Sequence, residues 1–288
     1  MVYSLRSLTD SIYKEKEHYL VVGNPIGHSL SPLMHNRALD YHTINADYLA
    51  LNLLPNEIDS FAAYCNREKF RGCNITIPYK QQFLELVDHI DDSAIEIGAI
   101  NTIVKESGKL VGYNTDLYGF MSPILDFAEI ISDGIAIVFG TGGASKAVLS
   151  GLIEIGVEEV VFVSRNPATI QIEHQHAHIH VVGYSQWQAY ADEATIIVNT
   201  TPLGMYPETH HSIVDDVDVD LLEGKISYDL IYNPDMTKFL KQAESVGGVV
   251  INGIEMFIQQ GNKSFELWTG ERFPIEIIKS TLMAKLNE

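Results

Sequence analysis

Cysteine is scarce in this chain of 288 residues, which contains only Cys65 and Cys73. Two cysteines are too few for the disulfide framework of a small secreted protein, and their spacing does not match a structural zinc site. The sequence therefore favours a reducing compartment. We expect a cytoplasmic protein whose site contains no metal ion.

Basic residues and long apolar runs are also scarce. Lys and Arg together number 19 against 38 for Asp and Glu, so the formal net charge is -19. Nucleic acids and anionic membranes bind basic surfaces, and this balance argues against both as partners. No apolar run approaches the roughly 18 residues that a membrane-spanning helix needs. Residues 1–18 carry charges where a secretory signal would be apolar. A small molecule is the partner that remains to be sought.

Apolar residues are plentiful by contrast, at 46% of the chain, and they fall into short segments separated by turn residues. The length is comfortable for two domains. Before Asp116 the pattern predicts strands 19–22, 47–51 and 73–77, helices 31–41, 54–70 and 80–86, and a hairpin with strands 99–104 and 110–113.

After Asp116 unbroken apolar strands alternate with helices, a pattern typical of a parallel sheet buried on both faces. The expected strands are 135–139, 160–163, 195–199, 226–230 and 249–251, and the expected helices are 117–129, 144–155, 255–260 and 275–286. This order predicts an α/β protein with an N-terminal α/β substrate domain and a Rossmann-like, doubly wound dinucleotide-binding domain. The substrate domain takes residues 1–115 plus 253–288, and the cofactor domain takes 116–252.

A glycine-rich loop follows the apolar strand 135–139 and precedes a helix. Glycines let the backbone approach a pyrophosphate, and the helix N-terminus offers unpaired N–H groups to it. Ser145 stands where the usual pattern has a third glycine, but the order of strand, loop and helix is the context that supports the motif. The residues expected to contact the cofactor are Gly140, Thr141, Gly142, Gly143 and Ala144.

The end of the next strand indicates which dinucleotide binds. An NAD site usually has a carboxylate there to hold the ribose 2′-hydroxyl. This sequence has Ser164, Arg165 and Asn166 instead. An arginine can pair with a 2′-phosphate, so NADP is favoured and NAD remains an alternative.

Several motifs, in one order from about residue 20 to the end of the chain, together resemble the shikimate dehydrogenase family, which includes quinate/shikimate dehydrogenases. They are residues 23–32 (GNPIGHSLSP), 74–80 (NITIPYK), 98–102 (GAINT), 112–116 (GYNTD), 140–145 (GTGGAS), 199–205 (NTTPLGM), 228–234 (YDLIYNP) and 252–256 (NGIEM). The resemblance implies an oxidoreductase of the shikimate pathway, in aromatic amino acid (chorismate) biosynthesis. Its reaction is the reversible NADPH-dependent reduction of 3-dehydroshikimate to shikimate.

The resemblance also implies residue roles. Lys80 and Asp116 match the catalytic pair, and both also match positions that bind substrate. The other matched substrate positions are Ser29, Ser31, Thr76, Asn101, Tyr232 and Gln260. Two further cofactor positions are Thr200 and Gly253.

These residue types suit the chemistry on their own terms. Shikimate is a carboxylate with three hydroxyls, so its site needs hydroxyl and amide partners and little charge. Ser29 and Ser31 can present two hydroxyls to one carboxylate, although Ser31 before a proline is also a candidate helix cap. Lys80 is expected at a helix N-terminus, where the dipole disfavours its charge and a carboxylate such as Asp116 favours it. Which of the two passes the proton stays open.

Two alternative functions and the oligomeric state remain open at this point. One is a quinate/shikimate dehydrogenase that uses NAD or both cofactors, and another is a non-catalytic relative that senses the ligand. Both a homodimer and a monomer are possible assemblies.

The alternating histidines His174, His176, His178 and His180 would share one face of a strand. We interpret them as an exposed edge strand rather than a metal site.

Overall fold

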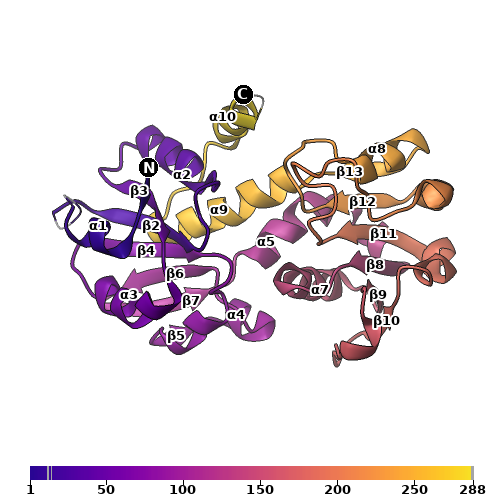
Figure 1. Ribbon diagram of the computed structural model, residues 1–288, viewed down its shortest axis with the longest axis horizontal. Coiled ribbons are helices and arrows are strands. Elements are labelled where there is room, and N and C mark those ends of the chain that lie inside the picture. The colour runs from indigo at the N-terminus through magenta and orange to yellow at the C-terminus, as the bar shows by residue number, and fades with distance from the viewer. Residues whose placement is uncertain (12, 14, 287–288) are drawn as a thin grey trace. The chain divides into compact units, whose positions relative to one another are not determined.

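The computed structural model describes residues 1–11, 13 and 15–286, which divide into two compact units. The first unit comprises Met1–Thr115 and Gln260–Glu288, and the second comprises Asp116–Gln259. Each unit is built around its own sheet (Figure 1). The boundary predicted at residue 253 falls at the start of a helix that runs from one unit into the other.

The first unit contains a seven-stranded sheet. Its strands, in spatial order, are β1 (Val2–Tyr3), β3 (Asp47–Asn52), β2 (His18–Gly23), β4 (Phe70–Ile75), β6 (Thr102–Glu106), β7 (Lys109–Tyr113) and β5 (His89–Ile90). The first four are parallel, β6 runs antiparallel to β4, and β6 and β7 form the predicted hairpin. The carboxyl ends of β2, β3 and β4 therefore meet at one edge of the sheet.

Helices accompany this sheet. They are α1 (Leu5–Thr9), α2 (Ser31–Tyr41), η2 (Pro55–Glu57), α3 (Ile58–Cys65), η3 (Gln82–Glu85), α4 (Asp92–Ile97), α9 (Gly253–Thr269) and α10 (Ile275–Leu286), where η marks a 3-10 helix. The side of α2 that carries Met34, Ala38 and Leu39 is buried, as the apolar stripe predicted. α10 lies beside α2 (Figure 1).

Two helix predictions in this unit are wrong. The expected helix 54–70 is a 3-10 turn followed by α3, which ends at Cys65, and the fully buried Phe70 is the first residue of β4. The expected helix 80–86 is only η3. The Lys80 carbonyl accepts the backbone N–H of Ile100 at 2.8 Å, so it does not serve an α-helical bond from Leu84.

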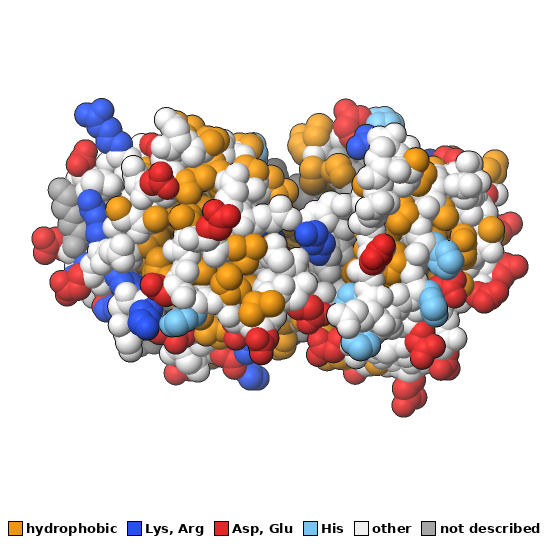
Figure 2. Space-filling model, turned by 90° about the horizontal axis from the view of Figure 1, so that it is seen from below, with side chains coloured by type: hydrophobic (Ala, Val, Ile, Leu, Met, Phe, Trp, Pro, Cys, Tyr) orange, Lys and Arg blue, Asp and Glu red, His pale blue; other side chains and the backbone are white. Residues whose placement is uncertain are grey.

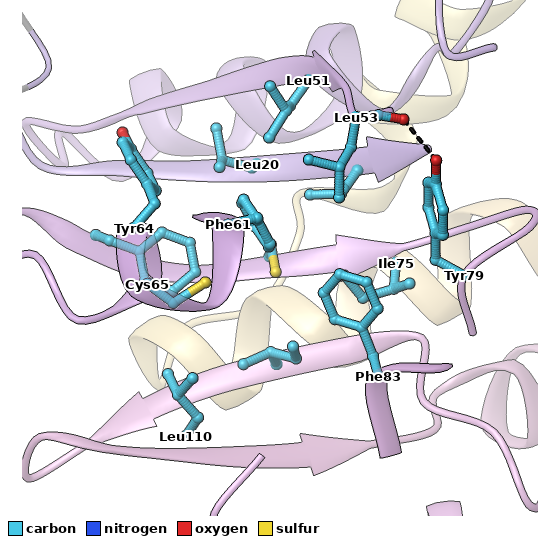
Figure 3. Close-up of a cluster of buried hydrophobic side chains, with 14 of the residues drawn as sticks. Leu20, Leu51, Leu53, Phe61, Tyr64, Cys65, Ile75, Tyr79, Phe83 and Leu110 are labelled. Atoms are coloured by element: carbon cyan, nitrogen blue, oxygen red, sulfur yellow. Dashed lines mark hydrogen bonds between the residues drawn. The ribbon is translucent and has the colours of Figure 1, made fainter. Parts of the chain in front are cut away.

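One core cluster of the first unit lies against one face of its sheet. Strand residues such as Leu20 and Leu51 pack with Phe61 of α3 and with Phe83, which η3 contributes (Figure 3). Tyr79 closes the cluster, and its hydroxyl donates to the Leu53 carbonyl at 2.5 Å. This packing fixes the segment around Lys80 although that segment is not α-helical.

The second unit contains a six-stranded sheet in which all neighbouring strands are parallel. Its strands, in spatial order, are β10 (His178–Val182), β9 (Glu159–Val163), β8 (Ile135–Phe139), β11 (Ala194–Asn199), β12 (Ile226–Asp229) and β13 (Val249–Ile251) (Figure 1). The strand order reverses between β8 and β11, as in a doubly wound fold, and ligands bind at such a switch point. The predicted α/β class with a Rossmann-like domain is confirmed.

The second unit's helices are α5 (Asp116–Met121), η4 (Ser122–Phe127), α6 (Ala128–Ser132), α7 (Gly143–Ile155), η5 (Pro167–Thr169), η6 (Trp187–Glu193), η7 (Asp216–Leu222) and α8 (Lys238–Ser245). The continuous helix expected over 117–129 is wrong. Pro123 has no backbone N–H to donate, and the chain passes through the 3-10 helix η4 there. The expected helix 255–260 is part of the longer α9.

The histidine segment is partly an edge strand. Only His178 and His180 lie in β10, at the edge of the sheet, while His174 forms an isolated bridge with Ala177. A single strand with all four histidines on one face is therefore wrong. On the face shown in Figure 2 acidic side chains are spread over the surface, in keeping with the negative net charge. Among the described residues no helix has the length and apolar character needed to cross a membrane.

Candidate functional site

The glycine loop occupies the switch point of the second unit's sheet. Gly140 directly follows β8 with a φ of 102°, a conformation that favours glycine. A Cβ there would lie 2.5 Å from Oγ1 of Thr200, which follows the neighbouring strand β11. Thr200 is itself fixed, because its Oγ1 donates to the Phe139 carbonyl at 2.7 Å. The predicted cofactor residues Gly140 and Thr200 thus lie side by side.

The start of α7 has the features of an anion-binding site. Gly142 is the N-cap, its conformation is extended, and no side chain caps the helix. A Cβ at Gly142 or Gly143 would meet nothing within 4 Å, so open space lies beside the first N–H groups. These groups and the helix dipole favour a pyrophosphate there. Thr141 and Ala144 flank the two glycines and are placed by the same turn.

Ser145 explains the departure from the usual glycine pattern. Its side chain is buried, and its hydroxyl donates to the Gly142 carbonyl at 2.7 Å. The hydroxyl therefore stabilises the turn into α7 at the position where other sequences have a third glycine.

The segment after β9 lies next to the loop because β9 pairs with β8. Ser164 is fixed by a bond from its N–H to the Val182 carbonyl at 2.9 Å, and its hydroxyl accepts the N–H of Asn166 at 3.3 Å. Arg165 between them is exposed. No carboxylate occupies residues 164–166, so these residues fit a 2′-phosphate better than a ribose 2′-hydroxyl.

Gly253 begins α9 at a close approach of two backbones. A Cβ there would lie 2.1 Å from the Leu230 carbonyl oxygen, so only glycine fits. Its N–H donates to the Ile231 carbonyl at 3.0 Å. Tyr232, which follows Ile231 in the chain, stacks on Phe257 of α9 with ring centres 5.0 Å apart. Burial raises the pKa of the Tyr232 hydroxyl. The start of α9 thereby fixes the segment that carries Tyr232.

In the first unit, Ser29 and Ser31 lie at the start of α2. The Ser29 hydroxyl accepts the N–H of Ser31 at 3.3 Å. Ser31 is the first helical residue, and Leu30 is the N-cap without a side-chain bond. The reading of Ser31 as a helix cap is therefore wrong, which leaves its hydroxyl to other partners.

Backbone bonds bring Thr76, Lys80 and Asn101 into one region of the first unit. The Thr76 N–H donates to the Val22 carbonyl at 2.9 Å, and the Asn101 carbonyl accepts the Ile75 N–H at 2.8 Å. The Lys80 carbonyl accepts the N–H of Ile100, the residue before Asn101. All three lie where β2 and β4 end, and the side chains of Thr76 and Lys80 are half-buried.

The remaining predicted residues are divided between the units. Asp116 is the first residue of α5 and belongs to the second unit, directly after the buried Thr115 of the first. Tyr232 also belongs to the second unit, and Gln260 of α9 belongs to the first. Asp116 and Gln260 are both half-buried.

Sequence reasoning missed a buried polar group in each unit. In the first unit Asn101 contacts Thr102 and Thr115, which are both buried. Thr102 and Thr115 belong to two of the family motifs, but no role was predicted for their hydroxyls. Ser264 contacts Thr102, and Tyr48 reaches it through Asn74; neither Ser264 nor Tyr48 lies in a recognisable motif.

In the second unit the missed residue is Asp229, which is fully buried at the end of β12. Its carboxylate accepts bonds from Asn199 at 3.0 Å, from the Ile231 N–H at 3.0 Å and from the Thr237 hydroxyl at 2.7 Å. Burial raises the pKa of Asp229 to about 7, and the three donors oppose that rise. Asp229 thereby joins the loops that follow β11 and β12 to the start of α8.

Three family models match parts of the chain. The shikimate dehydrogenase substrate binding domain matches residues 21–103, and the shikimate 5'-dehydrogenase C-terminal domain matches residues 253–283. A model described as NADP oxidoreductase coenzyme F420-dependent matches residues 134–227.

Known relatives cover nearly the whole chain. A shikimate dehydrogenase (NADP(+)) of Bacillus cereus (strain AH187) is 37% identical over 277 residues, which cover 94% of this chain and 99% of the relative. One of Nostoc sp. (strain PCC 7120) is 34% identical over 278 residues, covering 93% and 96%.

Solved structures agree. Shikimate 5-dehydrogenase of Thermus thermophilus, in complex with NADP(H) and shikimate, has a TM-score of 0.81 at 32% identity and covers 93% of this chain and 99% of its own. The Listeria monocytogenes enzyme, in complex with shikimate and NAD, has a TM-score of 0.83 at 27% identity and covers 93% and 96%.

Proposed function

The chain belongs to the shikimate dehydrogenase family, as the motifs predicted, and we propose that its residues carry out the reversible NADPH-dependent reduction of 3-dehydroshikimate to shikimate. The observation that carries this function is the loop Gly140–Gly143 between β8 and the uncapped start of α7, with open space beside Gly142 and Gly143. This loop is the proposed binding site of the cofactor. In the other unit, hydroxyl and amide side chains lie at the carboxyl ends of the parallel strands, where they can bind a substrate.

NADPH is the cofactor that fits this loop. The N–H groups at the start of α7 hold the pyrophosphate, and Gly142 and Gly143 leave room for it. Arg165, with Ser164 and Asn166 beside it, binds the 2′-phosphate through charge-assisted hydrogen bonds. When bound, NADPH supplies the hydride for the ring ketone.

The substrate is held mainly by neutral donors and acceptors. Ser29 and Ser31 bind the carboxylate, and Thr76, Asn101, Tyr232 and Gln260 bind the ring hydroxyls or shape the site. The buried amide of Asn101 supports this role, because a site built to hydrogen-bond a hydroxyl discriminates strongly against an analogue that lacks it.

Lys80 and Asp116 handle the proton. As the ketone is reduced, an alkoxide develops on the substrate and needs both a proton and positive charge. Lys80 supplies one or both as general acid or electrostatic stabiliser. Asp116 orients Lys80 and the hydroxyl that forms. In the reverse direction the same groups accept the proton.

Initial rates with shikimate and with quinate, each with NADP and with NAD, test the function. We expect the highest kcat/KM for shikimate with NADP. A preference for quinate with NAD would establish the quinate-type alternative, and no turnover with any pair would establish a ligand sensor.

The location and the assembly of the chain are part of the proposal. We propose a cytoplasmic protein, which the two free, buried cysteines Cys65 and Cys73 support, since neither is part of a disulfide. A homodimer stays a prediction, and light scattering on the purified chain decides between it and a monomer.

A further inference from the structure

A group of three candidate metal ligands lies on the loop after β11, outside the residues proposed for cofactor and substrate. Glu208, His210 and His211 each offer one ligand atom, and these atoms all lie within 4.8 Å of one another. Glu208 Oε2 is 3.7 Å from His210 Nε2 and 3.7 Å from His211 Nδ1. A tetrahedral ion bound at about 2.0–2.1 Å separates its ligand atoms by about 3.3 Å. The three atoms therefore reach one ion after small side-chain shifts.

The backbone of this loop is fixed independently of any ion. Gly204 has a φ of 95°, and a Cβ there would lie 3.1 Å from the His211 carbonyl oxygen, so the loop folds closely on itself. The His211 N–H donates to the Glu208 carbonyl at 3.3 Å, and Ser212 donates to Gln242 at 2.6 Å. Because the backbone is ordered already, an ion has to order only side chains.

The ligand types determine which ion fits. Two imidazoles and one carboxylate suit zinc, nickel, copper or cobalt, whereas magnesium and calcium prefer sites made of oxygen atoms. The three side chains are 49–72% exposed, so water would complete the coordination of a bound ion. We propose that Glu208, His210 and His211 form a binding site for a divalent transition-metal ion.

Calorimetric titration of the full chain with Zn²⁺ tests this proposal. We expect one ion per chain at this site, lost in the double variant H210A/H211A. Glu208→Gln should weaken binding by at least about tenfold, the lower end of what the loss of even an outer partner of a metal ligand costs.

The double variant H174A/H176A is the matched control, because it also removes two neighbouring histidines whose ring centres are 5.7 Å apart. It should bind Zn²⁺ like the wild type. Unchanged binding in H210A/H211A, equal loss in both double variants, or no binding by the wild type would each overturn the proposal.

A second inference concerns the buried network around Asn101. Nδ2 of Asn74 lies 3.0 Å from Thr102 Oγ1 and 2.9 Å from Ser264 Oγ, and Oδ1 of Asn74 accepts the Tyr48 hydroxyl at 2.6 Å. All of these residues are buried. Hydrogen bonds in such a low-dielectric interior are strong, and a missing partner there is costly.

The network fixes both ends of the Asn101 amide. Oδ1 accepts the Thr102 hydroxyl at 2.9 Å and the Thr115 N–H at 2.8 Å, and Nδ2 donates to the Thr115 hydroxyl at 3.0 Å. The orientation of the Asn101 amide is therefore set by its hydrogen bonds to Thr102 and Thr115.

The same network reaches helix α2 and one other predicted substrate residue. The Tyr48 backbone N–H donates to Asn36 Oδ1 at 2.8 Å, and Asn36 lies on α2, the helix that begins at Ser31. The Ser264 hydroxyl donates to the Gln260 carbonyl at 3.0 Å, one turn earlier on α9. One continuous set of bonds thus connects α2, the start of β6 and α9.

We infer that Tyr48, Asn74, Thr102 and Ser264 are positioning residues that hold Asn101, Gln260 and helix α2, which begins at Ser31, in register for the substrate. This inference rests on the proposed substrate role of Asn101. A displacement of about 1 Å in such a site can lower the rate about a hundredfold, so loss of one hydroxyl has a kinetic cost.

Thr102 offers the sharpest test, because Val matches its shape and Ser keeps its hydroxyl. Thr102→Val should raise KM for shikimate and lower kcat/KM by up to about a hundredfold, by the displacement argument, and leave KM for NADP nearly unchanged. Thr102→Ser should restore most of the affinity. A lower melting temperature with unchanged KM for shikimate would make Thr102 merely structural and overturn the inference.

Asn101→Ala, measured in parallel, separates the two proposals. If it leaves KM for shikimate unchanged, the substrate role of Asn101 fails and the positioning inference fails with it. If it raises KM while Thr102→Val does not, the substrate role stands and only the positioning inference is overturned.

Discussion

The position of Lys80 is set by its backbone, because the hydrogen bond from the Ile100 N–H to the Lys80 carbonyl holds Lys80 close to Asn101. Lys80→Ala should lower kcat about 100- to 10,000-fold, the usual worth of general acid–base assistance. Binding of shikimate should weaken much less, because the alkoxide that Lys80 stabilises develops only in the transition state. Steady-state kinetics in both directions measure this.

Ser29→Ala is the contrasting variant. The carboxylate that Ser29 is proposed to bind does not change charge during the reaction, so its loss should raise KM with a smaller effect on kcat. If Lys80→Ala instead kept a near-normal kcat and only raised KM, Lys80 would be a binding residue, and proton transfer would pass to Asp116 or water.

Arg165 is exposed after β9, with no carboxylate on either side of it. Arg165→Ala should raise KM for NADP far more than KM for NAD, because only NADP carries the 2′-phosphate. Cofactor titrations at fixed shikimate measure both constants. Equal effects on the two cofactors would remove Arg165 from this role.

Residues with a chemical signature in the sequence were the easier ones to predict. Gly140 and Gly253 were predicted from motifs. In the structure Gly140 is required by its positive φ and by the side chain of Thr200, and Gly253 is required by a close contact with the Leu230 backbone. Thr102 and Ser264 could not be predicted as part of the site, because their importance lies in a hydrogen bond that joins residues 162 positions apart in the chain.

Two glycines at the β8–α7 turn have separable roles. Gly140→Ala combines a positive φ with a contact of 2.5 Å to Thr200, so it should lower the melting temperature. Gly142→Ala meets nothing within 4 Å, so it should leave the melting temperature nearly unchanged.

The methyl group of Gly142→Ala occupies the space proposed for the pyrophosphate, so KM for NADP should rise in this variant. Thermal unfolding without cofactor and cofactor titration separate the two effects. Normal NADP affinity in Gly142→Ala would argue against pyrophosphate binding at this turn.

Elements with a strong internal pattern were predicted well. β8 has the predicted bounds, because strands buried in a parallel sheet are apolar along their length. β13, an edge strand that is only partly buried, also has the predicted bounds, because all three of its residues are apolar. Elements decided by distant partners were not. The segment after Lys80 has helical apolar spacing, yet a bond from Ile100 across the fold takes the carbonyl that an α-helix would need.

At the scale of the whole chain, each unit contains a buried group whose shifted pKa bears on stability in acid, His35 in the first and Asp229 in the second, and the two shifts have opposite effects. His35 in the first unit is 1% exposed and stacks on Tyr48, and neither ring nitrogen has a partner among the described residues. Burial lowers the pKa of His35 from 6.5 to about 3. Burial raises the pKa of Asp229 in the second unit from 3.8 to about 7.

The signs follow from which state binds more protons. Between pH 6.5 and about 3 the unfolded chain protonates His35 and the folded chain does not, so this group makes the first unit less stable as the pH falls. Between pH 3.8 and about 7 the folded chain keeps the proton on Asp229, so this group makes the second unit more stable as the pH falls. Each slope is at most about 1.4 kcal/mol per pH unit.

The two tryptophans can report the units separately, because Trp268 belongs to the first and Trp187 to the second. In Trp187→Phe, the urea midpoint followed by Trp268 should fall between pH 6.5 and 4.5, and adding His35→Leu should flatten that fall. In Trp268→Phe, the midpoint followed by Trp187 should be maintained or rise, and adding Asp229→Asn should remove this gain in acid.

If both reporters gave one shared transition, the units would unfold together and the two slopes would largely cancel in the wild type. His35→Leu would then make the chain more stable towards acid, whereas Asp229→Asn would make it less stable. The opposite responses of these two substitutions therefore test the pKa shifts whether or not the units unfold separately. Equal pH dependence in the wild type and both variants would contradict the assignment of either group as buried and shifted.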